Sequence, residues 1–207
     1  MYKSMKKTLS AMTIAVSLTS LVALNACATA QSVPQDNFYR LAPQPETSQQ
    51  GGILQDATVE VARFVADGSV SNRPILYSSD ANPNSVSEYH YHFWIEAPPT
   101  LIKDSLVSYL RAAGIANRVV TPEMRVSSDY SVLGRIKRLE IYTGKKYTGV
   151  ASFEIGLRRN SDGELLVLNE YESKVEANNN SVGSVITAVE KATEDIFARF
   201  VHDISAK

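Results

Sequence analysis

The chain has 207 residues, of which 44% are hydrophobic and 21% charged, and this composition suits one globular domain with a sizeable core. Its formal net charge is −1. Lys3, Lys6 and Lys7 precede Cys27 and no acidic residue does, so removing those three charges from −1 leaves −4 for the rest. A mildly acidic body gives no electrostatic reason to expect a nucleic-acid partner or attraction to anionic lipid headgroups.

Residues 1–26 have the pattern of a secretory signal peptide, with a basic start, an apolar middle from about residue 9 to 24 and small residues near the end. Ser and Thr interrupt the apolar run, which is short for a membrane span, so removal is favoured over anchoring by a helix. The run ends in Leu-Asn-Ala-Cys at 24–27. This ending resembles the bacterial lipobox, in which the Leu and the small residue before the cysteine position its thiol for diacylglycerol attachment.

Cys27 is the one cysteine of the sequence, so a disulfide within the chain is excluded. We expect Cys27 to carry diacylglycerol and a palmitate-type acyl chain, because several acyl chains on one residue make a durable anchor. The alternative is a buried cysteine within an ordinary signal peptide. Ala28 stands where an Asp would favour retention at the inner membrane, so the lipobox implies the outer membrane, with the protein on its periplasmic face.

Two polar stretches flank the first compact apolar piece, NFYRL at 37–41. Residues 28–36 are small and polar, and with the lipidated Cys27 they predict a tether at 27–36. The stretch APQPETSQQGG has no periodicity and predicts a flexible insert at about 42–52. A single domain is expected from 37 to 207.

The body opens with strand patterns, at about 53–66 and at 73–79. The stretch SEYHYHFWIEAP at 87–98 alternates with a period of two. Its odd positions, 89 to 95, are Tyr, Tyr, Phe and Ile and form one face. Its even positions, 90 to 96, are His, His, Trp and Glu and form the other, which we expect to be the wetter one.

Helical spacing predicts two amphipathic helices. The first covers 100–113, with Thr100 as its N-cap and Gly114 as its stop, and the second covers 181–204. Strands are predicted between them at about 117–121, 129–144, 146–160 and 163–177. The NSDG turn at 160–163 joins the last two as antiparallel neighbours. The predicted fold class is α+β, a mostly antiparallel sheet with two amphipathic helices packed on one face.

Candidate sites for chemistry are few. The sequence contains no G-x-S-x-G motif and no glycine-rich phosphate loop. His90 and His92 share a strand face and could hold a metal, but spacing identifies no third ligand, so two polar side chains on the wetter face are the favoured interpretation. No catalytic residue, metal or cofactor is assigned, and we do not expect an enzyme.

Trp94 has two interpretations. Its ring packs beneath a loop, or it joins His90 and His92 in a surface that binds a partner protein, where aromatic side chains are over-represented. The sequence leaves both open.

The order of several motifs resembles that of the ABC-type transport auxiliary lipoproteins, the PqiC-like group. The motifs are the lipobox at Cys27, FYRL at 38–41, RPILYSS at 73–79, FWIEAPP at 93–99, LGRIKRLEIY at 133–142 and the terminal amphipathic helix. The resemblance covers nearly all of the chain after Cys27.

That resemblance implies a periplasm-facing, outer-membrane lipoprotein that docks the end of a transport conduit. Its implied partners are an MCE-domain protein and inner-membrane transport components, with lipid as cargo and self-association of the chain also compatible with the family. It implies no catalytic residues. The alternatives are a structural lipoprotein that braces or assembles the cell envelope without moving cargo, and a lipid-anchored hydrolase with an unrecognised motif.

Overall fold

The computed structural model describes residues 34–46 and 54–207, and residues 36–207 form one compact unit. The predicted signal peptide at 1–26, Cys27 and the tether up to residue 33 lie outside the described residues, as do positions 47–52 of the predicted insert. Within the described part, no helix is both long enough and apolar enough to cross a membrane.

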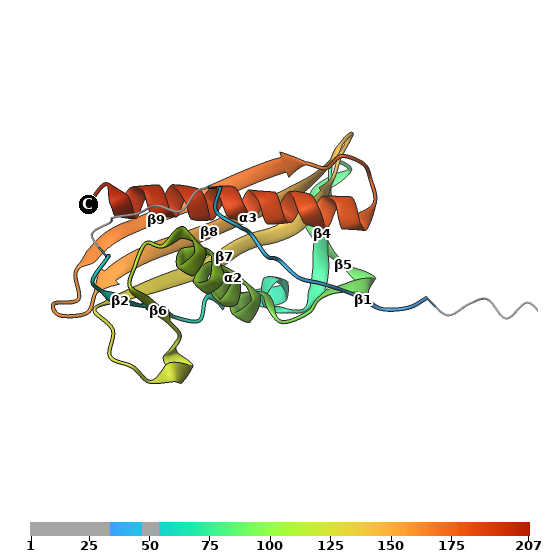
Figure 1. The fold of residues 1–207 in the computed structure, drawn as a ribbon. Helices are drawn as coiled ribbons and strands as arrows, with labels where there is room; N and C mark the ends of the chain where they lie inside the picture. Colours follow the sequence, from blue (N-terminus) through green and yellow to red (C-terminus); the bar gives the residue numbers. More distant parts are fainter. Residues whose placement is uncertain (1–33, 47–53) are drawn as a thin grey trace, which may run out of the picture. The chain divides into compact units, whose positions relative to one another are not determined.

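Three long antiparallel strands form the main part of the sheet (Figure 1). The strand β7 (Tyr130–Thr143) pairs with β8 (Tyr147–Arg159) along its whole length, and β8 pairs with β9 (Leu165–Glu176). The predicted turn at 160–163 joins β8 to β9, and Gly163 adopts a positive φ of 77° there, which a glycine tolerates without steric cost. The antiparallel part of the prediction is therefore confirmed.

Three short strands share the other edge of β7, each parallel to it. They are β2 (Thr58–Val61), β3 (Val65–Ala66) and β4 (Pro74–Ser79). The single strand predicted at 53–66 is therefore two short pieces that meet different parts of β7, whereas the strand predicted at 73–79 is confirmed.

The remaining strands extend the sheet outward from this edge. A short strand, β6 (Arg118–Val120), pairs parallel with β2. The strand β5 (Asn82–Trp94) pairs antiparallel with β4, and β1 (Asn37–Tyr39) pairs parallel with β5. The sheet is thus mixed, because the short strands are parallel to their neighbours in most pairings while the long strands are antiparallel. The α+β class is confirmed with this addition.

The first helix, α2 (Pro98–Ala113), begins two residues before the predicted start. Its N-cap is Ala97, and Thr100 lies inside the first turn, so the predicted cap was wrong. Pro98 and Pro99 suit the first turn because their missing N–H groups would have no helical partner. Gly114 ends the helix in the left-handed conformation, with φ 66°, as predicted.

The second helix, α3 (Val182–Ser205), lies along the long strands (Figure 1). The Ser181 hydroxyl caps it by accepting the N–H of Ser184 at 3.3 Å. Gly149 of β8 permits close packing, because a Cβ there would lie 2.2 Å from the backbone nitrogen of Val189. The helix and the strand therefore approach each other backbone to backbone at this point.

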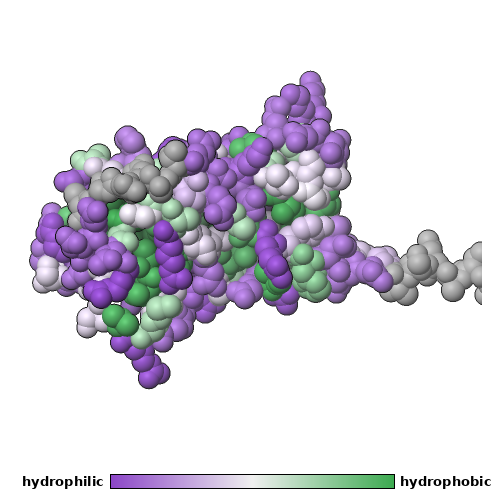
Figure 2. Space-filling model, in the orientation of Figure 1, coloured by the Kyte–Doolittle hydropathy of each residue, from purple (hydrophilic) through white to green (hydrophobic). Residues whose placement is uncertain are grey.

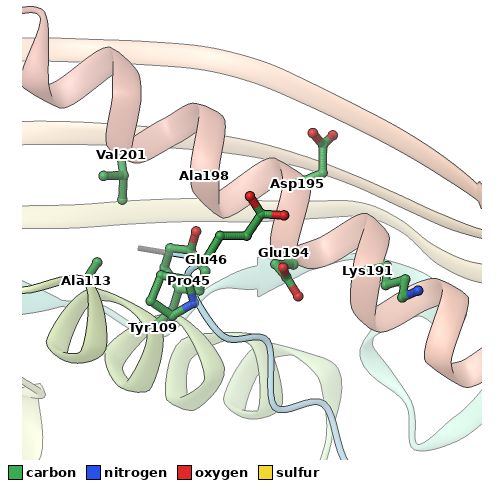
Figure 3. A pocket seen from close by; sticks show the side chains of 9 residues that line it. All are labelled: Pro45, Glu46, Tyr109, Ala113, Lys191, Glu194, Asp195, Ala198 and Val201. Atoms are coloured by element: carbon green, nitrogen blue, oxygen red, sulfur yellow. The ribbon is translucent and has the colours of Figure 1, made fainter. Parts of the chain in front are cut away.

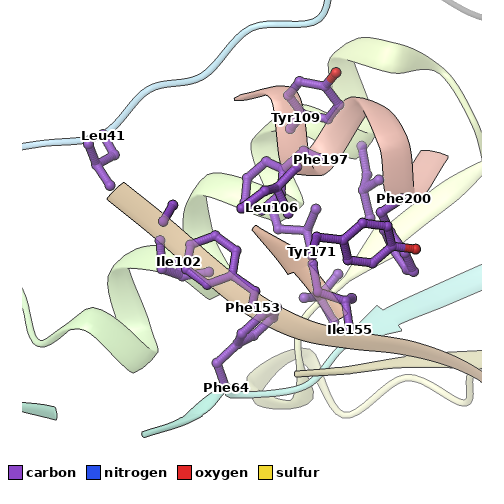
Figure 4. Close-up of a cluster of buried hydrophobic side chains, with 14 of the residues drawn as sticks. Leu41, Phe64, Ile102, Leu106, Tyr109, Phe153, Ile155, Tyr171, Phe197 and Phe200 are labelled. Atoms are coloured by element: carbon purple, nitrogen blue, oxygen red, sulfur yellow. The ribbon is translucent and has the colours of Figure 1, made fainter. Parts of the chain in front are cut away.

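Both helices share one aromatic core with the sheet (Figure 4). Tyr109 of α2 meets Phe197 of α3 edge to face, with ring centroids 5.4 Å apart, and Phe197 lies 6.3 Å from Phe153 of β8. Phe64 meets Phe153 at 6.5 Å and occupies the space left by the missing side chain of Gly134. The prediction of two helices packed on one face is confirmed by this shared core.

The described part of the predicted insert packs against the body. Leu41 and Pro43 are buried, and the N–H of Ala42 donates to Glu190 of α3 at 2.8 Å. The Ser105 hydroxyl of α2 donates to the carbonyl of Leu41 at 3.0 Å. This short segment is thereby hydrogen-bonded to both helices.

Candidate interaction site

The residues singled out from the sequence differ in their exposure. Cys27 lies outside the described residues, so lipidation stays a prediction. Trp94 is 1% exposed and belongs to the core, which is the first of its two interpretations. His90 is exposed and His92 is partly buried. A partner surface at this edge can therefore include the exposed His90 but not the Trp94 ring.

The alternation predicted for 87–98 holds only in two parts. Tyr89 faces inward between the exposed Glu88 and His90, whereas from residue 92 onward the even positions face inward. Trp94, at an even position, points into the core, whereas Tyr91 and Ile95, at odd positions, are exposed. Both faces of the stretch carry aromatic residues, so hydrophobicity alone did not distinguish them. The register of β4 with β5 is irregular here, because Pro74 pairs with Phe93 but Leu76 pairs with Glu88, and the inward face of β5 changes along this segment.

Trp94 holds three strands together at the start of the folded unit. The backbone N–H of Trp94 donates to the carbonyl of Arg73 at 2.8 Å, and the backbone carbonyl of Trp94 accepts from Nε of Arg73 at 3.1 Å. The next residue, Ile95, donates its N–H to the carbonyl of Tyr39 at 2.8 Å. The buried indole and these hydrogen bonds fix β1 and β4 to the end of β5.

Phenol and imidazole rings join β1 to β5 on the side that faces inward. Tyr39 Oη and His92 Nδ1 are 2.8 Å apart, and Tyr89 meets the His92 ring edge to face at 5.5 Å. Burial raises the pKa of Tyr39, and burial followed by the neighbouring Tyr147 and Tyr77 raises the pKa of Tyr89. The Tyr39 phenol thus keeps its proton and can donate it to Nδ1 when the imidazole proton is on Nε2.

The histidines are not arranged as a metal site with further ligands. Across 34–46 and 54–207, no three His, Cys, Asp or Glu side chains converge. Nδ1 of His92 is hydrogen-bonded to Tyr39, so this ring contributes to the packing of β1 on β5.

The opposite side of β1 and β5 exposes apolar rings. Phe38 and Phe93 face each other in register, with centroids 5.8 Å apart. Tyr91 lies two residues before Phe93 on β5, and the period of two turns it to the same side. Ile95 follows the end of β5 and lines a neighbouring hollow with Leu41 and Leu101. The exposed fractions are 52% for Phe38, 43% for Tyr91 and 37% for Ile95. We call Phe38, Tyr91 and Phe93 the aromatic edge.

A cation lies against the aromatic edge. The guanidinium carbon of Arg73 is 5.2 Å from the centroid of the Phe38 ring, within the range of a cation–π contact. The edge therefore offers aromatic rings and a guanidinium side by side. The position of Arg73 is fixed by the hydrogen bond from its Nε to the carbonyl of Trp94.

A second exposed apolar region, the aliphatic patch, consists of Val65, Leu165 and Leu168. Their exposed fractions are 51%, 49% and 55%, close to that of Phe38. They line a shallow hollow of about 230 Å³ whose lining includes Gly156. This patch contains no aromatic ring and lies on β3 and β9, away from the strand that follows the predicted tether.

A larger hollow of about 540 Å³ lies between α2 and α3 (Figure 3). Its lining includes the carboxylates of Glu46, Glu194 and Asp195 and the ammonium group of Lys191, with Tyr109 contributed by α2. Burial first, and then the nearby carboxylates of Glu46 and Glu190, raise the pKa of Glu194. Because charged groups dominate this lining, the hollow is unsuited to an acyl chain. In the view of Figure 2, hydrophobic residues interrupt a mainly hydrophilic surface in separate patches.

Sequence reasoning missed the aromatic edge as a surface. It treated NFYRL at 37–41 as the first compact apolar piece and the odd positions of 87–98 as one strand face, without joining them. The available signal was that an aromatic segment directly follows a polar tether, since a strand entering a sheet from a tether is commonly an edge strand with one uncovered side.

Comparisons with known proteins identify the fold and a family model. The model described as "ABC-type transport auxiliary lipoprotein component" matches residues 39–201. The crystal structure of XCC0632 from Xanthomonas campestris, described as DUF330, superimposes with a TM-score of 0.70 at 17% identity, covering 80% of this chain and 92% of that one. An uncharacterized protein superimposes with a TM-score of 0.64 at 13% identity, covering 83% and 99%. No curated protein sequence matches the chain.

Proposed function

The chain belongs to the family of ABC-type transport auxiliary lipoprotein components, and on this premise we propose that it is an outer-membrane-anchored, periplasmic accessory of an intermembrane lipid transport system. The family match carries the proposal, because it spans the folded unit from β1 to the last turns of α3. The family match therefore concerns the folded unit as a whole and not one segment of it.

The proposed anchor is Cys27. The Leu-Asn-Ala-Cys sequence at 24–27 supports acylation of this thiol after removal of residues 1–26, and residues 27–36 then connect the lipid to β1. An anchor of this kind raises the local concentration of any partner in the same compartment, so a modest interface suffices for docking.

The proposed partners are an MCE-domain protein and inner-membrane transport components, with lipid as the cargo and the folded unit docking the outer end of the conduit. Support comes from the family and from a unit whose described surface offers apolar patches for binding. Self-association of the folded unit is compatible with this role and is tested by light scattering of the purified protein.

Acylation and sorting are tested with two variants of the full chain. Cys27→Ser is expected to abolish incorporation of labelled palmitate and to leave unprocessed precursor in the inner membrane. Ala28→Asp is the matched variant, expected to keep the label but to move the protein to the inner membrane fraction. Normal maturation of Cys27→Ser would overturn the anchor, and an outer-membrane Ala28→Asp would overturn the sorting assignment.

Transport and bracing are distinguished by the partner. Cross-linking in intact cells, followed by purification of the full chain, is expected to recover an MCE-domain protein. Recovery only of cell-wall or assembly machinery would favour the structural alternative, in which the protein braces or assembles the envelope without moving cargo.

A further inference from the structure

We propose that the aromatic edge rests on the interfacial region of the phospholipid bilayer and so orients the folded unit against the membrane. The inference deepens the proposed function and rests on it, since the surface in question is the membrane that holds Cys27. The observations that carry it are the chemistry of the edge and its place in the chain.

The length of chain between Cys27 and Asn37 is the first argument. Ten peptide steps separate them, which reach at most about 35 Å when fully extended. A flexible segment of this length spans only roughly 17 Å on average. Because β1 is the first strand of the compact unit, its edge is the part of that unit held closest to the bilayer.

The side chains of the edge are the second argument. Tyr and Trp rings are enriched where a membrane meets water, because each has an apolar ring and a polar group, and Phe is found on the apolar face of segments that lie in this interface. Arg73 stacks on Phe38 at 5.2 Å, so a guanidinium that can bind a lipid phosphate lies beside a ring that can enter the acyl boundary. Tyr91 adds a hydroxyl at the same surface.

The charge of the body defines the kind of contact. The part of the chain from Cys27 onward carries about −4 by formal count, so attraction to anionic headgroups does not drive the contact. The aromatic edge should therefore bind zwitterionic lipid, and salt should weaken the contact little.

The aliphatic patch supplies a matched control. Leu168 is as exposed as Phe38, yet its patch has neither an aromatic ring nor a stacked guanidinium, and it is built on strands remote in the chain from the tether. Exposure alone therefore predicts equal membrane contact at both places, whereas the proposal predicts contact at the aromatic edge only.

The test uses residues 28–207, because the compact unit 36–207 contains all the members of the core and is expected to fold without the signal peptide. An N-terminal histidine tag replaces the lipid and binds the protein to phosphatidylethanolamine/phosphatidylcholine vesicles that contain a nickel-chelating lipid. This segment lacks Cys27, so Tyr91→Cys or Leu168→Cys carries a single polarity-sensitive fluorophore. Quenching by nitroxide lipids then reports membrane contact.

The expected result is several-fold stronger quenching at position 91 than at position 168, with a blue shift at 91 only. Adding Phe38→Asp should reduce the quenching at 91 to the level at 168, and Phe38→Ser should reduce it partly. Circular dichroism and thermal melting establish that each variant is folded.

Equal quenching at the two positions would overturn the proposal. So would a blue shift at 91 that rises with protein concentration in the absence of vesicles, because a second copy of the chain would then cover the edge. Neither result depends on acylation of Cys27, so the failure of this inference and the failure of the lipid anchor are distinguishable.

Discussion

The slab formed by β7, β8, β9 and α3 differs from the edge formed by β1 and β5 in how its side chains are used. In the slab, β8 pairs with a long antiparallel strand on each side and α3 covers the sheet. Phe153, Phe197 and Phe200 are completely buried there. At the edge, β1 has three residues, and Phe38 remains about half exposed. Aromatic residues therefore stabilise the slab, whereas at the edge some of them are left free to bind.

The two regions should respond differently to the same substitution. A change in the slab disturbs a continuous core and lowers the free energy of unfolding of the whole unit. A change on the exposed side of the edge leaves that core intact, so it should alter binding with little effect on stability.

The largest effect is expected for Phe197→Asp. The ring is fully buried between Tyr109 and Phe153, and the substitution removes it and places an unpaired charge in an apolar site. Loss of a buried Phe side chain alone costs about 3–5 kcal/mol, and a buried charge costs more, so the unit should unfold. Urea denaturation checks this, with Phe38→Asp as the matched control, expected to lower the free energy of unfolding by only about 1 kcal/mol through the loss of its contacts with Phe93 and Arg73. Equal losses would remove the distinction between the regions.

Gly149→Ala should have the next largest effect. A Cβ at this position would lie 2.2 Å from the backbone nitrogen of Val189, and a backbone cannot move aside as a side chain can. Overpacking of this kind costs about 3 kcal/mol or more because α3 must shift from the sheet. In the control Gly183→Ala nothing lies within 4 Å of the new methyl group, so stability should be unchanged or rise by up to about 1 kcal/mol. Similar melting temperatures for both variants would contradict the close approach.

A hydrogen bond between β9 and α3 makes the slab sensitive to pH. Tyr171 Oη donates to Oδ2 of Asp203 at 2.7 Å. Burial and then this hydrogen bond raise the pKa of Tyr171 to about 12, and the same hydrogen bond is the main reason that the pKa of Asp203 is lowered. The raised pKa of Tyr171 gives a stabilisation that is complete below the unfolded-state value of about 10 and is lost as pH rises toward 12. The lowered pKa of Asp203 gives a second stabilisation. It is present above the unfolded-state pKa of about 3.9 and is lost as the pH falls through the lowered pKa.

Tyr171→Phe tests this pair. The free energy of unfolding should fall by about 2 kcal/mol at neutral pH, because a hydrogen bond to a carboxylate is lost, and the loss of stability between pH 10 and about 12 should become smaller. Urea denaturation at a series of pH values measures both effects. An alkaline loss of stability as large as in the original protein would show that other groups cause it.

The smallest effect is expected for Tyr39→Phe at the edge. The substitution keeps the ring but removes the hydroxyl that lies 2.8 Å from His92 Nδ1, a hydrogen bond of about 1 kcal/mol. Because β1 is short, the effect should be local. Hydrogen exchange should accelerate at β1 and at Ile95, whose N–H donates to Tyr39, while β8 should remain protected. Faster exchange across β8 as well would show that the edge and the slab unfold together.

Several elements could be predicted from the sequence because local rules determine them. Gly114 ends α2, and Ser181 precedes α3, because cap chemistry acts over a few neighbouring residues. The strand predicted at about 146–160 is present as β8, because Ala151, Phe153, Ile155 and Leu157 recur at every second position and are all buried in the core. The wrong N-cap at Thr100 arose because two prolines had already satisfied the first turn.

The faces of β5 could not be predicted, because both carry aromatic residues and long-range pairing decides which is covered. The candidate surface depended on the same information. Phe38 and Phe93 are distant in sequence and become neighbours only when β1 adds to the sheet in parallel register. Arg73 reaches Phe38 because it is fixed to Trp94.

Residue order over short distances was enough to predict the two amphipathic helices and the α+β class, and it is the basis of the predicted signal peptide at 1–26 and of the predicted acylation at Cys27. The tertiary structure alone decided that Trp94 is buried and Tyr91 exposed, that the short strands pair in parallel, and that Phe38 and Arg73 meet. The physical reason is that burial is a property of what covers a surface. At an edge strand the covering element comes from elsewhere in the chain, or from the membrane or protein that the edge meets.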